Sequence, residues 1–133
     1  MIEQPTSKQA RAADGWRVGF WVVAALGIPA AAVAWAWYGL AQFEAQTEQG
    51  KAVSAGTTMA GFAEMVGGVP LVLAHLLGLI GLIVLGYKGY GNSGIVFSVT
   101  AVLIASGVGI GVAQLLWAGE LFQLGITNNT YVP

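Results

Sequence analysis

The single histidine of this chain, His75, has the widest chemical repertoire of its side chains. It lies inside an apolar run, where an imidazole needs a partner within the protein because lipid offers none. Haem ligation is one possible use, but a b-type haem in a membrane usually takes a second axial ligand. Met59 and Met65 could supply it only if their segment folded inward. The commoner use is a hydrogen bond between helices, so we expect His75 to bond to another helix, of this chain or of a partner.

Three more polar side chains, Glu64, Gln114 and Glu120, lie near the ends of apolar runs. A proton or ion pathway would also need carboxylates near the middle of the bilayer, and the sequence places no charge there. Glu64 and Glu120 are therefore interpreted as solvated rim residues. The sequence also has no HExxH, GxxxxGK[ST] or GxSxG motif and no paired acid cluster. We expect no catalytic residue, no metal site, no cofactor and no enzymatic activity.

The composition of the chain indicates whether it resides in water or in a membrane. Of its 133 residues, 56% are hydrophobic and 8% are charged, whereas a soluble domain carries about 25% charged residues. A net charge of −1 leaves no basic field to hold nucleic acid. Because cysteine is absent, disulfides, thiolate metal sites and iron–sulfur clusters are excluded. These features predict an integral membrane protein.

Three apolar runs are long enough to span a bilayer, which takes about 20 helical residues. They cover residues 16–43, 66–87 and 95–119. The first helix could continue to residue 49, and Pro29 near its middle predicts a kink. This first run exceeds the apolar core of a signal peptide, so we expect it to remain as a membrane anchor. The sequence thus predicts one all-α membrane domain with three transmembrane helices.

The segments between the predicted spans complete this domain. They are an N-terminal cytosolic tail, an outer loop, an inner turn and an outer C-terminal tail, at residues 1–15, 44–65, 88–94 and 120–133. The inner turn is short and glycine-rich, which predicts an antiparallel hairpin of the second and third spans.

Part of the outer loop has a helical pattern. Thr57 or Thr58 could cap a short helix that presents Met59, Phe62 and Val66 on one face. This spacing suits a helix lying in the membrane interface. An ordered loop packed on a neighbour explains the pattern equally well.

Basic residues predict the orientation. With three spans, the N-terminus and the inner turn share one side of the membrane, and that side holds Lys8, Arg11, Arg17 and Lys88. The other side holds only Lys51. Because cytoplasmic segments carry the excess of lysine and arginine, we expect the N-terminus in the cytoplasm and the C-terminus outside.

A stripe of small residues marks the third predicted span. Ala101, Ala105, Gly109 and Ala113 recur every four residues, with a GxxxG pair, Gly107 and Gly111, alongside. Small residues let helix backbones approach closely in a membrane. We expect the four-residue stripe to be a helix-packing interface. Since three helices can bury only part of their small and polar faces together, we also expect one face of the bundle to meet another protein.

The overall plan resembles the small accessory subunits of actinobacterial cytochrome bcc–aa3 respiratory supercomplexes. The segments that carry this resemblance are QARAADGWRVGFW, AVAWAWYG and YKGYGNSG. The resemblance implies a non-catalytic structural or assembly subunit of the electron-transport chain in a bacterial plasma (inner) membrane. Its partners would be other integral membrane subunits and lipids, and those other subunits would hold the haems and copper.

Two further functions stay open. One is a small self-associating transporter or channel, in which the stripe builds an oligomer around a pore. The other is a cofactor-binding membrane protein that uses His75. The absence of a charge at mid-membrane counts against the first, and the lack of a second histidine counts against the second.

Overall fold

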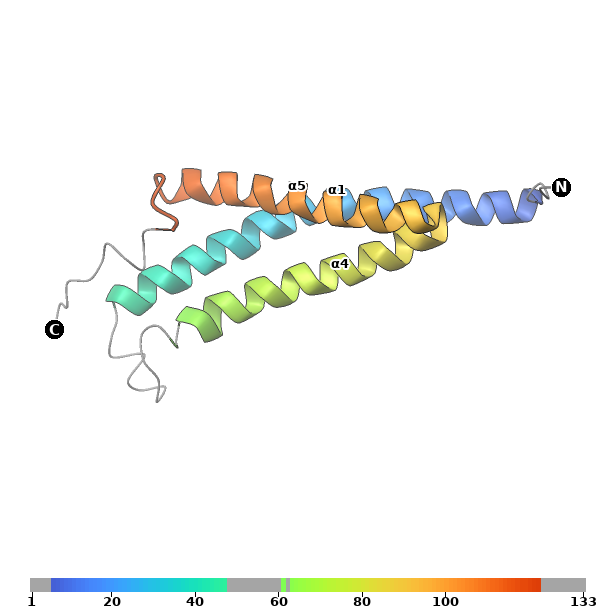
Figure 1. Ribbon diagram of the computed structural model, residues 1–133. Helices are drawn as coiled ribbons and strands as arrows, with labels where there is room; N and C mark the ends of the chain where they lie inside the picture. Colours follow the sequence, from blue (N-terminus) through green and yellow to red (C-terminus); the bar gives the residue numbers. More distant parts are fainter. Residues whose placement is uncertain (1–5, 48–60, 62, 123–133) are drawn as a thin grey trace.

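The computed structural model describes residues 6–47, 61 and 63–122, which form a bundle of long helices (Figure 1). Helix α1 spans Ser7–Thr47, α4 spans Val69–Tyr90 and α5 spans Asn92–Leu116. A π-helical turn, η1 (Glu64–Gly68), leads directly into α4. Three stretches in this part of the chain are long and apolar enough to cross a membrane: Ser7–Glu44, Glu64–Tyr90 and Asn92–Leu116. The predicted all-α fold with three membrane-spanning helices is confirmed.

Helix α1 begins at Ser7, so residues 7–15 of the predicted N-terminal tail are helical and continuous with the first span. A capping box fixes this start. The Thr6 backbone N–H donates to Gln9 Oε1 at 2.9 Å, and the Gln9 N–H donates to Thr6 Oγ1 at 3.2 Å. Each side chain thereby satisfies a backbone donor that the first helical turn leaves free. The helix continues through Pro29 to Thr47, close to the predicted limit of residue 49.

The predicted inner turn of residues 88–94 is also mostly helical, and only Gly91 separates α4 from α5. Its φ of +67° lies in a region that glycine adopts without steric cost. Two further glycines let the helices meet next to it, since a Cβ on Gly86 would lie 2.7 Å from the Gly94 carbonyl oxygen. The hydroxyl of Ser98 donates to that same oxygen at 2.6 Å. This close backbone contact holds the end of α4 against the start of α5 beside the one-residue turn.

The second span starts at Glu64 instead of residue 66, because η1 adds a turn before α4. Pro70 therefore lies inside a continuous helical stretch, where its missing N–H leaves the Val66 carbonyl without its usual donor. The indole N–H of Trp37 donates to that carbonyl at 2.8 Å and ties η1 to α1. Of the predicted interfacial helix, residues 57–60 and 62 lie outside the described residues, residues 61 and 63 are helical, and Val66 belongs to η1.

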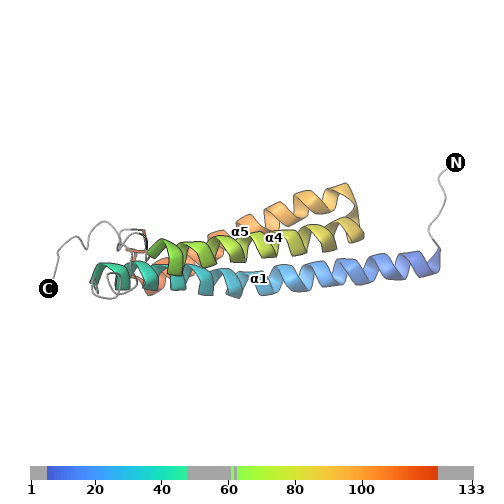
Figure 2. The same cartoon turned by 90° about the horizontal axis from the view of Figure 1, so that it is seen from below.

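Helix α1 packs against both α4 and α5, and the two views agree on this arrangement (Figure 1, Figure 2). The contacts between helices use small side chains, and Phe20 and Leu121 are the largest fully buried apolar ones. Many large apolar side chains point outward instead, such as Leu77, Leu115 and Val33. An apolar exterior around a core of small residues is the pattern expected of a multi-pass membrane protein.

Candidate functional site

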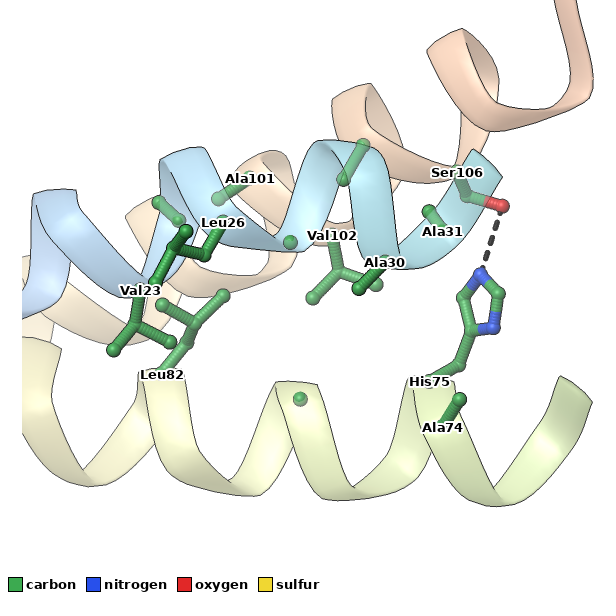
Figure 3. Close-up of a pocket in the computed structure, with 14 residues that line it drawn as sticks. Val23, Leu26, Ala30, Ala31, Ala74, His75, Leu82, Ala101, Val102 and Ser106 are labelled. Carbon is green, nitrogen blue, oxygen red and sulfur yellow. Dashed lines mark hydrogen bonds between the residues drawn. The ribbon is translucent and has the colours of Figure 1, made fainter. Parts of the chain in front are cut away.

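A polar junction joins the three helices. It consists of Trp35 from α1, His75 from α4 and Ser106 from α5. Ser106 Oγ lies 3.0 Å from His75 Nε2 and accepts the Trp35 indole N–H, also at 3.0 Å (Figure 3 shows the His75–Ser106 contact). His75 Nδ1 lies 2.8 Å from the carbonyl oxygen of Leu71, one turn earlier in α4. The Trp35 and His75 rings pack edge to face, with their centroids 6.2 Å apart. Each helix thus contributes one side chain to a single network.

The backbone partner of the imidazole fixes the direction of one of its two hydrogen bonds. The Leu71 carbonyl can only accept, so His75 Nδ1 carries a hydrogen and donates it. In a neutral ring Nε2 then accepts, and Ser106 supplies the hydroxyl hydrogen. Ser106 Oγ in turn accepts from Trp35. In that form of the ring the donors run from Trp35 through Ser106 and His75 to the Leu71 carbonyl, and each of these groups has a hydrogen-bond partner.

The expected helix–helix hydrogen bond of His75 is confirmed, with Ser106 of the same chain as its partner. A metal bound to His75 Nε2 would displace the Ser106 hydroxyl. Ser106 would then still accept from Trp35 but would lose its own acceptor. Of the two methionines considered as second ligands, Met65 is exposed on η1 and Met59 lies outside the described residues. This geometry counts against haem binding at His75.

A cavity of about 270 Å³ adjoins the junction, with His75 and Ser106 at one end and Val23 and Leu82 at the other (Figure 3). Small residues create the space, since a Cβ added at Gly27 would meet nothing within 4 Å. His75 is the one ionisable side chain of the lining, and both of its nitrogens are already hydrogen-bonded. The lining can hold an apolar group such as a lipid chain, but it offers no acid–base pair.

The predicted packing stripe lies inside the bundle. Ala105, Gly109 and Ala113 are buried, and the partly buried Ala101 lines the cavity. A Cβ on Gly109 would lie 2.7 Å from the Ala31 carbonyl carbon, so at this point the stripe contacts the α1 backbone. The structure therefore uses the stripe between α5 and α1. At Gly109 the α1 backbone thus occupies the place that a partner helix would take.

The remaining polar residues singled out in the sequence lie apart from the junction. Glu64 at the start of η1 and Glu120 beyond α5 are exposed. Gln114 accepts the Leu121 backbone N–H at 3.1 Å and so holds the segment that follows α5. No group of three potential metal ligands occurs within residues 6–47, 61 and 63–122.

Comparison of the chain with protein-family models, with curated proteins and with solved structures found no match. The function of the chain therefore has to be inferred from its own residues and their geometry.

Replacing Ser106 by alanine tests the junction. The change removes the acceptor of Trp35 and the donor to His75. Because hydrogen bonds between membrane helices contribute about 0.6–2 kcal/mol each, we expect Ser106→Ala to lower the free energy of unfolding by about 1–3 kcal/mol in mixed micelles. Ser93→Ala, at an exposed position of the same helix, is the control. Equal stability of the two variants would show that the network contributes nothing.

Proposed function

We propose that this chain is a non-catalytic structural or assembly subunit of a larger membrane complex. The observation that carries the proposal is a projecting part of α1. Arg17 lies level with the end of α4, because its Nε donates to the Gly89 carbonyl at 2.8 Å. Residues 7–15 extend beyond that level as a single helix, past the α4–α5 turn (Figure 1, Figure 2). At about 1.5 Å per residue, the projection is about 14 Å long.

The projecting segment, residues 7–15, packs on no other described helix. All of its side chains are exposed except Ala13, which is partly buried. An isolated helix shorter than about 12–15 residues is marginal in water, but here α1 continues it and the Thr6–Gln9 capping box fixes its start. A short rigid rod outside the bilayer, with Ala10, Ala12 and Ala13 on its surface, suits contact with a neighbouring subunit.

The saturated hydrogen bonds of His75 support a non-catalytic role for this chain. We propose a respiratory complex of the cytochrome bcc–aa3 type on the strength of the resemblance in its sequence. In that setting other integral membrane subunits carry the haems and copper, and the chain resides in a bacterial plasma membrane. The self-associating channel has less support, because the small-residue stripe is engaged with α1 and the cavity is lined by apolar residues.

Blue-native electrophoresis of the untagged protein from its own membranes tests this proposal. We expect the chain to migrate with a larger, haem-containing assembly. A variant with Ala10, Ala12 and Ala13 all changed to glutamine keeps the charge of the rod and good helix formers at all three positions, but it covers the apolar surface. It should dissociate from the assembly, whereas the control Ser7→Gln, which adds a glutamine at an exposed position outside the alanine surface, should stay bound. A small symmetric oligomer of this chain alone would overturn the proposal and favour the channel.

We further propose that the N-terminus lies in the cytoplasm. The supporting observation is that four basic residues, Lys8, Arg11, Arg17 and Lys88, belong to the end of the bundle formed by the start of α1 and the α4–α5 turn. A reporter active only outside the cytoplasm should be active when fused after Pro133 and silent when fused at Gly91. The reverse pattern would invert the orientation.

A further inference from the structure

Contacts between α1 and α4 hold two cations in place next to the α4–α5 turn. Arg17 donates from Nε to the Gly89 carbonyl, and its guanidinium carbon lies 5.0 Å from the centre of the Tyr90 ring. The Tyr90 hydroxyl accepts the Trp21 indole N–H at 2.7 Å, which fixes that ring. The ammonium of Lys88 lies 4.4 Å from the centre of the Trp16 ring. We name Arg17, Lys88 and these three aromatic residues the basic edge.

Protein carboxylates neutralise little of the charge on the basic edge. Among the described residues, the ion pair found there joins Arg17 and Asp14 at 3.8 Å, with side chains that are 47% and 72% exposed. Such an exposed pair contributes little. No described carboxylate lies within ion-pair distance of Lys88. The edge therefore presents net positive charge to whatever surrounds it.

The two cations lie close together at one level of the bundle. Gly89, which follows Lys88, is packed so closely on α1 that a Cβ there would lie 3.1 Å from the Arg17 backbone nitrogen. The aromatic members of the edge also indicate its depth, because tryptophan and tyrosine gather where membrane helices meet the headgroups. The positive charge thus lies where lipid phosphates lie.

We propose that the basic edge binds the headgroup phosphate of an anionic phospholipid between α1 and α4. Aromatic contacts hold both cations in place before the lipid binds, so little side-chain freedom is lost on binding. Apolar surface for the acyl chains continues from the edge toward the membrane interior, where Val18 and Trp21 are 63% and 55% exposed. A soluble phosphate could use the charge but not this apolar surface. Basic pockets between membrane helices are known to select anionic headgroups in this way.

Native mass spectrometry of the full chain tests the site. The protein is released from neutral-detergent micelles that contain traces of phosphatidylglycerol and phosphatidylcholine in equal amounts. We expect retention of phosphatidylglycerol over phosphatidylcholine. Lys88→Gln should weaken that retention about fivefold, the effect of one basic residue near an anionic lipid. The variant should fold normally, since Lys88 is exposed.

Lys8→Gln is the matched control, because it removes the same charge from the projecting part of α1 and should leave lipid retention unchanged. Equal loss of lipid in the two variants would reduce the effect to overall charge and overturn the site. Equal retention of the two lipids by the unaltered chain would also overturn it. Added glycerol phosphate should not displace the lipid. Displacement by it would identify a site for soluble phosphate instead.

Discussion

Gly109→Leu should separate α5 from α1 and destabilise the bundle by about 3 kcal/mol or more. Even a Cβ at this position would lie 2.7 Å from the Ala31 carbonyl carbon and 2.9 Å from both the Ala31 oxygen and the Ala32 nitrogen. All three are backbone atoms, so no rotamer change can relieve the contact. Overpacking of a core typically costs about 1–3 kcal/mol, and here a whole isobutyl group has to fit between two helices. Unfolding in mixed micelles measures the effect.

The sequence offers close controls for this change. Gly107→Leu makes the same substitution two residues earlier, where an added Cβ would meet nothing within 4 Å. Val108→Leu and Leu103→Ile alter exposed positions of the same helix. All three variants should unfold near the wild type. If Gly109→Leu has the same free energy of unfolding as these controls, the stripe does not pack on α1. Its surface would then be available to a partner.

The spacing of the small residues predicted close packing but not the neighbour. A stripe such as Ala105, Gly109 and Ala113 shows that a backbone approaches, while the identity of that backbone depends on how the helices cross. The same limit applied to His75. Its need for a hydrogen bond follows from an imidazole in an apolar run, yet Ser106 and Trp35 are 31 and 40 residues away along the chain. Only the relative register of three helices brings them together.

The three spans could be predicted because hydropathy over about 20 residues determines membrane insertion. Their ends could not, because local backbone chemistry decides them. The Thr6–Gln9 pair is a capping box visible in the sequence, and it would have predicted the start of α1 at Ser7. The length of the inner turn was harder to predict. Its glycines are typical of a loop, but Gly89 and Gly94 are helical and serve contacts with Arg17 of α1 and with Gly86 of α4.

The sequence also predicts that one face of the bundle meets another protein. The structure gives a different reason to expect such a partner. In the sequence this expectation rested on small residues left over after packing three helices. In the structure three of the four stripe residues are buried within the chain. The support for a partner now comes from residues 7–15, which are helical and project beyond the bundle. The surface that we propose for a partner is therefore the projecting start of α1, residues 7–15.

Gly94→Ala should be the most damaging single-methyl change among the glycines that the structure describes. A Cβ at Gly94 would overlap the carbonyl group of Gly86 and lie 2.7 Å from the Tyr87 nitrogen. The contact lies three residues after Gly91, the one residue between α4 and α5, so the hairpin cannot open there without losing its turn. The added methyl group would also displace the Gly94 carbonyl, which accepts a hydrogen bond from the Ser98 hydroxyl. We expect a loss of about 3 kcal/mol, the upper end for overpacking.

Gly81→Ala isolates the steric part of this effect, because it adds the same methyl group to a helix where nothing lies within 4 Å. Alanine favours a helix over glycine by about 1 kcal/mol, so this control should be as stable as the wild type or slightly more stable. Both variants gain the same propensity, and the difference between them measures the contact alone. Unfolding in mixed micelles should therefore place Gly94→Ala about 3–4 kcal/mol below Gly81→Ala. Equal stabilities would mean that α4 and α5 do not meet at Gly86 and Gly94. The connection would then be the longer turn of residues 88–94 that the sequence predicts.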